Sequence, residues 1–121
     1  MNSSDFNKLT EACCEEIRET LSQKGQDYSG DLDRLQNFKD ASDMTGLTPE
    51  ACLFGFVVKH IVALQDYIRN VDDPVACPSE AQLVEKTGDI AVYLLPLLRG
   101  LLIDRGLMPG YAERIGITNE D

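Results

Sequence analysis

The spacing of apolar residues predicts an amphipathic first helix over about residues 5–24. Ser3 or Ser4 can cap its start, and Gly25 is a natural C-terminal stop. Its apolar stripe recurs every four residues and consists of Leu9, Cys13, Ile17 and Leu21. Such a stripe indicates a helix that lies with one face on a core.

A short second helix is predicted over about residues 33–44, after a turn at residues 28–31. Its apolar residues follow a helical spacing and do not alternate as those of a strand would. They are Leu35, Phe38, Ala41 and Met44.

Two further helices are apolar on most of their circumference. The first has Thr48 as a capping hydroxyl and Pro49 in its first turn, and should extend over residues 48–70. The second starts with a capping box at Ser79 and should extend over residues 79–104.

Pro96 lies inside the last of these helices. Because proline has no N–H, it removes the hydrogen bond to the Val92 carbonyl, and a kink is expected near Val92. The tail at about residues 107–121, which follows Gly106, has an irregular pattern.

The two apolar helices are joined by a connector of about eight residues, so they should pack antiparallel. The sequence therefore predicts one all-α domain over residues 1–121. It is a helical bundle of three long helices plus one short helix, with the two apolar helices as a core hairpin. One amphipathic and one short helix cannot cover so much apolar surface, so self-association into a homo-oligomer is expected.

Composition narrows the possible partners. The formal net charge is −10, which disfavours binding to a DNA or RNA polymer and to an anionic membrane face. The longest unbroken apolar stretch, Ile90 to Leu98, is about half of a membrane span. Four cysteines without a CxxC pair, and no signal-peptide pattern, favour reduced thiols in the cytoplasm.

Charged residues within the apolar hairpin form the first candidate site. Lys59 and Asp89 each lie about 15 residues from the middle of the connector, so they should meet if both face the seam. The expected row of polar groups is Lys59, Asp66, Glu85, Asp89 and the Tyr93 hydroxyl, with His60 beside it. Charges in an apolar wall need a counterpart. That counterpart is either a ligand or a structural ion pair of Lys59 with Asp89 or Glu85, and both readings stay open.

A second candidate cluster combines basic, amide and aromatic groups beside the short helix. These are the groups that a nucleotide requires, for its phosphates, its base edges and its base plane. The cluster consists of Lys24, Tyr28, Arg34, Asn37 and Phe38. The alternative is an ordinary polar loop in which Tyr28 and Phe38 hold the segment to the core.

Several short motifs in order resemble those of small bacteriophage proteins of the helical, MazG-like kind, which are often labelled nucleotide-modification-associated. The motifs are K-G-Q-D-Y (24–28), D-R-L-Q-N-F (33–38), L-T-P-E (47–50), V-K-H (58–60) and E-K-T-G-D-I-A-V-Y-L-L (85–95). The resemblance implies an oligomeric helical bundle, a small nucleotide as ligand and, for a phage protein, the host cytoplasm.

The resemblance also implies a magnesium site, from which this chain departs. MazG-type pyrophosphatases carry E-x-x-E on one helix and E-x-x-D on the next, and these carboxylates hold Mg²⁺ against a triphosphate. Glu85 and Asp89 match part of this pattern, but Lys86 stands where a ligand is normally found. Glu16 and Glu19 form an E-x-x-E pair on the side of the first helix that we assign to solvent.

Three functions remain as hypotheses. The first is a non-catalytic nucleotide binder without a cofactor, which in a phage would sequester a nucleotide second messenger of host defence. The second is a Mg²⁺-dependent nucleotide pyrophosphohydrolase that uses Glu85 and Asp89, with Asp66 or the Glu16–Glu19 pair. The third is an assembly or adaptor protein whose apolar helices serve only oligomerisation. No catalytic residue is assigned.

Overall fold

The computed structural model describes residues 1–27 and 35–118, and the side chains of residues 1–22 and 35–118. Within these ranges every regular element is a helix, which confirms the all-α class. The helices are α1 (Ser3–Asp27), α2 (Gln36–Thr45), α3 (Pro49–Arg69), α4 (Glu80–Val92), the π-helical turn η1 (Tyr93–Leu97), α5 (Leu98–Asp104) and α6 (Pro109–Arg114).

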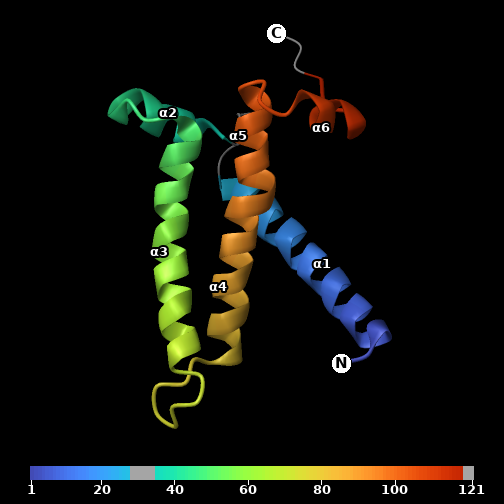
Figure 1. The fold of residues 1–121 in the computed structure, drawn as a ribbon, viewed down its shortest axis with the longest axis vertical. Coiled ribbons are helices and arrows are strands. Elements are labelled where there is room, and N and C mark those ends of the chain that lie inside the picture. The colour runs from blue at the N-terminus through green and yellow to red at the C-terminus, as the bar shows by residue number, and fades with distance from the viewer. Residues whose placement is uncertain (28–34, 119–121) are drawn as a thin grey trace.

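The predicted hairpin is present. α3 lies beside the continuous rod formed by α4, η1 and α5, and the two run in opposite directions from the connector at one end (Figure 1). In the connector, the Asp73 carboxylate accepts hydrogen bonds of 2.8 Å from the N–H groups of both Val75 and Ala76. These bonds lower the pKa of Asp73, because they stabilise its ionised form.

The predicted helix starts are also confirmed. The Thr48 hydroxyl accepts the N–H of Ala51 at 3.2 Å. Ser79 and Gln82 form a reciprocal capping box, with distances of 3.1 and 2.9 Å. Each cap occupies N–H groups that would otherwise have no partner in the first turn.

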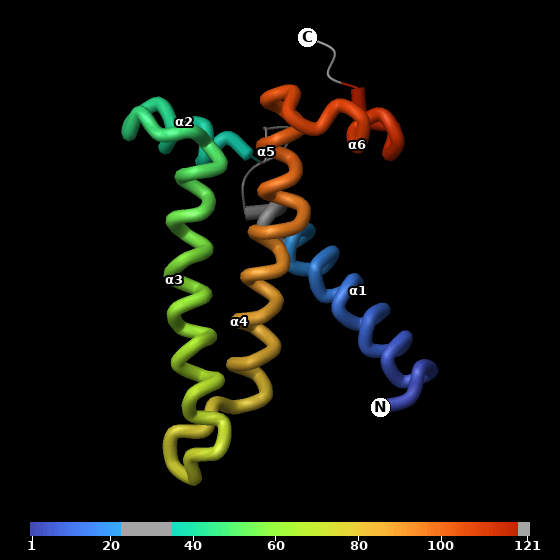
Figure 2. Tube along the Cα trace, in the orientation of Figure 1, coloured from blue at the N-terminus to red at the C-terminus, as the bar shows by residue number. Residues whose placement is uncertain are grey.

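The core lies between α3 and the α4–α5 rod. Leu53 and Val57 of α3 and Leu101 of α5 are almost completely buried, and Phe38 of α2 closes this cluster. The Phe38 ring packs edge-to-face on Phe56 and on Tyr93, with ring centroids 6.0 and 6.4 Å apart. α2 therefore crosses the end of the hairpin that lies opposite the connector (Figure 2).

Two ion pairs hold the same end of the hairpin together. Lys39 of α2 contacts Asp104 at 2.8 Å, and Arg105 contacts Glu50 at the start of α3. The second Glu50 carboxylate oxygen is buried without a hydrogen-bond partner among the described residues. Arg105 is thus the counter-charge of a carboxylate that has lost part of its hydration.

A kink was expected near Val92, and the structure has a π-helical turn at residues 93–97 directly after it, with Pro96 inside the turn. The helix continues on both sides, as α4 and α5. Lengthening the hydrogen-bonded turn accommodates the missing proline N–H without ending the helix.

The predicted ends of α1 were wrong at both termini. Asn2, not Ser3 or Ser4, supplies the cap, since its side-chain oxygen accepts the Asp5 N–H at 2.8 Å. The helix also continues past Gly25 to Asp27. A glycine inside a helix costs only about 1 kcal/mol relative to alanine, which does not force the helix to end.

The expected position of α1 is only partly correct. Its N-terminal half extends away from the rod (Figure 1), and Phe6 and Leu9 are 58% and 47% exposed. Among the side chains of α1 that the structure describes, up to residue 22, the half-buried ones are Ile17, Thr20 and Leu21. The apolar stripe is therefore longer than the surface that the chain offers to cover it.

The prediction of an irregular tail was wrong for residues 109–114, which form α6. Pro109 occupies the first helical position, where its missing N–H carries no cost. Ala112 is buried, and the Tyr111 hydroxyl accepts a 3.0 Å hydrogen bond from Arg99. Tertiary contacts thus stabilise a helix that is too short to form alone.

Among the described residues, α3 is long and apolar enough to cross a membrane by length and composition, with a mean hydropathy of 1.4. This is weak evidence for a span, because core helices of soluble proteins pass the same test. Only 11% of the apolar window is buried in the chain, so most of this surface is left uncovered.

We expect Leu53→Ala to destabilise the protein by about 2–5 kcal/mol, because it opens a cavity at the centre of the core. Leu53 is fully buried, whereas Leu9 of α1 is 47% exposed. Leu9→Ala is therefore the matched control and should cost less than about 1 kcal/mol. Urea unfolding followed by circular dichroism measures both values, and equal losses would contradict this assignment of the core.

Candidate functional site

The polar contact in the seam between α3 and α4 joins His60 to Lys86. The Lys86 ammonium donates to Nδ1 of His60 at 3.2 Å, and both side chains are half-buried. Because an ammonium can only donate, Nδ1 must be the acceptor, and the ring proton lies on Nε2. The His60 ring also packs on Tyr93, with centroids 5.4 Å apart.

The expected pairing of Lys59 with Asp89 was wrong. Lys59 is exposed, and within the described part of the chain no ion pair joins it to Asp89 or Glu85. The position along α3 at which a polar residue faces the seam was predicted to within one residue. One residue corresponds to a rotation of about 100° around the helix axis. His60 therefore faces the seam in place of Lys59.

The other residues of the predicted row do not meet in the seam either. Asp66 is exposed, and it lies about two helical turns after Lys59, on the same side of α3. Glu85 is exposed and Asp89 is half-buried, and both face a pocket towards α1. Of the predicted row, Tyr93 lies in the seam, beside His60.

The second predicted cluster lies largely outside the described residues. Tyr28 and Arg34 fall in the segment that is not described, and so does the side chain of Lys24. Asn37 is exposed at the start of α2. Phe38 is 8% exposed and belongs to the core, so its ring is packed against protein instead of being open to a nucleotide base.

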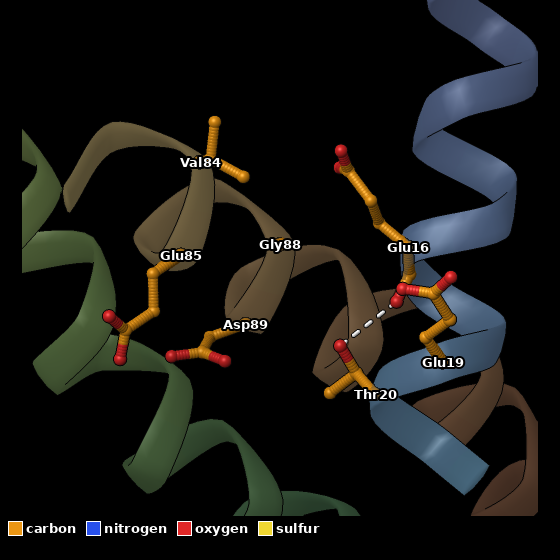
Figure 3. A pocket seen from close by; sticks show the side chains of 7 residues that line it. All are labelled: Glu16, Glu19, Thr20, Val84, Glu85, Gly88 and Asp89. Atoms are coloured by element: carbon orange, nitrogen blue, oxygen red, sulfur yellow. Dashed lines mark hydrogen bonds between the residues drawn. The ribbon is translucent and has the colours of Figure 1, made fainter. Parts of the chain in front are cut away.

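A pocket of about 200 Å³ lies between α1 and α4. Four carboxylates line it, Glu16 and Glu19 from α1 and Glu85 and Asp89 from α4 (Figure 3). The other described lining residues are Thr20, Val84 and Gly88, so no lysine or arginine is among the lining residues in the described part of the chain. We call this site the acidic pocket.

Helical spacing explains how each helix brings two carboxylates to the pocket. Residues three or four apart lie on one helix face, as do Glu16 with Glu19 and Glu85 with Asp89. Gly88 lies between the second pair, and a side chain there would meet no other atom within 4 Å. The missing side chain at residue 88 helps to keep the pocket open.

The acidic pocket has the donor atoms for a hard divalent cation but not a formed cage. Mg²⁺ and Ca²⁺ prefer carboxylate oxygens, which four lining residues provide. Among the described residues, however, no group of three or more His, Cys, Asp or Glu side chains is arranged to hold a metal ion. The carboxylates would have to move together to coordinate one.

Helical periodicity assigned Glu16 and Glu19 to the solvent side of α1, and the hydrolase hypothesis offered them beside Glu85 and Asp89 only as an alternative to Asp66. They are indeed exposed, but they also line the pocket. The missing information was the crossing of α1 over α4. The Lys86 contact also escaped notice, although Lys86 and Tyr93 are seven residues apart and so lie on one helix face.

No family model matches this sequence, and neither a curated protein nor a solved structure matches it. The resemblance to MazG-like phage proteins therefore stays a prediction.

The seam contact predicts energetic coupling between His60 and Lys86. In a double-mutant cycle with His60→Phe and Lys86→Met, we expect a coupling of about 0.5–1.5 kcal/mol in stability. A cycle with His60→Phe and Glu85→Gln is the control and should couple by less than about 0.5 kcal/mol, because Glu85 faces the acidic pocket. Equal coupling in both cycles would show that the seam contact contributes nothing specific.

Proposed function

We propose that the protein binds a small nucleotide together with a divalent cation at the acidic pocket, and that it acts as a Mg²⁺-dependent nucleotide phosphohydrolase. The observation that carries this proposal is that an E-x-x-E pair on α1 lines one pocket together with Glu85 and Asp89 on α4. The resemblance described above, which pairs carboxylates from two helices in the same way, supports it.

Electrostatics make a cation necessary in this proposal. The described lining has four carboxylates and no base, and these carboxylates repel the phosphates of a free nucleotide. A bound divalent cation would offset this charge and attract phosphate oxygens. Mg²⁺ commonly binds through one or two carboxylates and fills its other positions with waters and substrate phosphates.

Carboxylate oxygens are suitable ligands for such an ion. Most of these side chains are exposed, so they can change rotamer to approach it. Glu16, Glu19 and Glu85 are exposed, so changing their rotamers costs little packing. Asp89 is half-buried on α4 and would be the better fixed ligand. Mg²⁺ when bound neutralises phosphate charge. A carboxylate that remains free would accept a hydrogen bond from an attacking water and orient it.

A second candidate function is nucleotide binding without catalysis, as in sequestering a second messenger. It is favoured by Lys86, which replaces an expected acidic ligand and is engaged with His60. The lack of a formed cage among the described carboxylates also favours it. In this case the ligand would bind without a metal and would be recovered unchanged.

Asp89→Asn should abolish metal-dependent activity. With Mg²⁺ or Mn²⁺ present, we expect the protein to release pyrophosphate or phosphate from a nucleoside triphosphate, and the variant to lose at least about 100-fold of this rate, as when a residue that positions charge is removed. Calorimetry should show that Mn²⁺ binding is weakened in the same variant. Glu11→Gln is the control, because Glu11 lies on α1 but not in the pocket.

Hydrolysis that persists in Asp89→Asn would refute the proposed site. Nucleotide binding that is unaffected by EDTA, with no product formed, would instead support sequestration. If the protein binds none of a panel of mono-, di-, tri- and cyclic nucleotides, both nucleotide hypotheses are refuted and the adaptor hypothesis is the one that remains.

The protein is also proposed to act as a homo-oligomer. The chain exposes 8846 Å², whereas a monomeric protein of 13.4 kDa typically exposes about 6,500 Å². The difference of about 2,300 Å² is what a subunit loses in a large obligate interface. An uncovered apolar stripe on α3 repeats at spacings of four, three and seven, and consists of Phe54, Val58, Ile61 and Ile68. This spacing suits packing against the α3 of a second copy.

Light scattering should therefore show a dimer or larger oligomer. Ile61→Glu should dissociate it, because the variant places a charge within the apolar stripe. Lys59→Glu is the control, since Lys59 lies outside the stripe and is exposed. A monodisperse wild-type monomer would refute self-association, and flotation of that monomer with lipid vesicles would assign the stripe to a membrane.

A further inference from the structure

A second, larger cavity of about 500 Å³ lies on the other side of α1 from the acidic pocket. Its walls come from α1, from the π-helical turn with α5, and from α6 with the residues that follow it. Most of its lining side chains are apolar, among them Ile17, Leu21, Pro96, Ile103 and Ile115. We call it the apolar cavity. Its volume is that of a site for a small organic molecule.

Two arginines line the apolar cavity, and none of the described residues that line it is acidic. Arg18 comes from α1 and Arg99 from α5. In a chain with a formal net charge of −10, a cavity whose described charged residues are both positive is a local reversal of the overall field. The acidic pocket on the opposite side of α1 has the converse composition, with four carboxylates and no base among the residues described there.

Arg99 is positioned by a hydrogen bond to Tyr111 and still has guanidinium N–H groups that can donate to a ligand. One guanidinium N–H of Arg99 donates to the Tyr111 hydroxyl at 3.0 Å, and the Arg114 guanidinium lies 5.2 Å from the centre of the same ring. Among the described residues no carboxylate forms an ion pair with Arg99. A guanidinium carries five N–H groups, so most of them remain for an anionic ligand.

Arg18 is available as well. Its contact with Glu15 measures 3.6 Å and joins two side chains that are 79% and 60% exposed. Such a surface pair is easily exchanged for a better anionic partner. Arg18 and Arg99 therefore line the apolar cavity from two different helices, and both are exposed to solvent.

The backbone that lines the cavity is also irregular. Leu95 and Pro96 belong to the π-helical turn, and both are lining residues. π-helical turns inside α-helices occur frequently at functional sites, because they widen the helix and redirect side chains. The irregularity, the apolar walls and the two arginines coincide at one place in the fold.

We propose that the apolar cavity binds a small amphipathic anion, that is, an apolar or aromatic body carrying one carboxylate, sulfonate or phosphate group. The body occupies the space between Ile17, Leu21 and Ile103, and the anionic group pairs with Arg18 and Arg99. This site uses different residues from the acidic pocket and requires no divalent cation, so its failure would leave the proposed hydrolase untouched.

Fluorescence with two naphthalene probes tests the proposal. 8-Anilinonaphthalene-1-sulfonate carries the anionic group, and N-phenyl-1-naphthylamine has the same rings without it. Arg99→Gln and Arg18→Gln should each weaken binding of the sulfonate about tenfold and change binding of the uncharged probe less than twofold. Arg69→Gln, at the end of α3, is the control and should change neither. Sulfonate binding that is unchanged in both cavity variants would overturn the proposal.

A pair of adjacent cysteines tests the location of the probe. Cys13 and Cys14 are both exposed and free, but only Cys14 lines the cavity. Cys14→Trp should fill the space and abolish sulfonate binding, whereas Cys13→Trp should not. Equal binding in both variants would place the probe on another surface, such as the apolar stripe of α3, and would refute the site.

Competition then separates the possible sources of the anion. Decanoate offers a carboxylate on an aliphatic chain, and 1-naphthyl phosphate offers a phosphate on an aromatic ring. Displacement of the sulfonate probe by either, in the presence of EDTA, supports the proposal and identifies the preferred body. Displacement by neither overturns it.

Discussion

The packing of α3 against the α4–α5 rod positions every other element of this protein. Leu53, Val57 and Leu101 form an almost completely buried contact across the hairpin, and Phe38 brings α2 onto it. The His60–Lys86 contact in the seam depends on the same alignment of the two helices. Because few side chains are fully buried, this single layer of packing must supply most of the stabilisation from apolar burial.

The position of α1 decides the chemistry of the surface. α1 contacts the rod only near its C-terminal end, through half-buried side chains such as Ile17 and Leu21. Its two remaining sides then border cavities of opposite character, one lined by four carboxylates and one by apolar groups with two arginines. A single helix thus separates a pocket lined by carboxylates from a cavity lined by arginines and apolar side chains.

Much of the fold follows from local patterns in the sequence. Thr48 and Ser79 mark helix starts by chemistry that acts within four residues, and the π-helical turn lies where Pro96 predicts a distortion. The predictions failed where a distant contact decides the outcome. Helix α6 depends on Arg99 holding Tyr111, and no short-range pattern reveals that contact.

For the candidate sites, too, local sequence patterns predicted some features and tertiary packing decided the others. By itself, the sequence determined the helical class, the antiparallel hairpin and the approximate height at which polar residues of its two helices face each other. Only the tertiary structure decided that His60 instead of Lys59 faces the seam, and that Glu16 and Glu19 line one pocket with Glu85 and Asp89. Periodicity defines which residues share a helix face, but the rotation and crossing of helices depend on side-chain packing between segments distant in the chain.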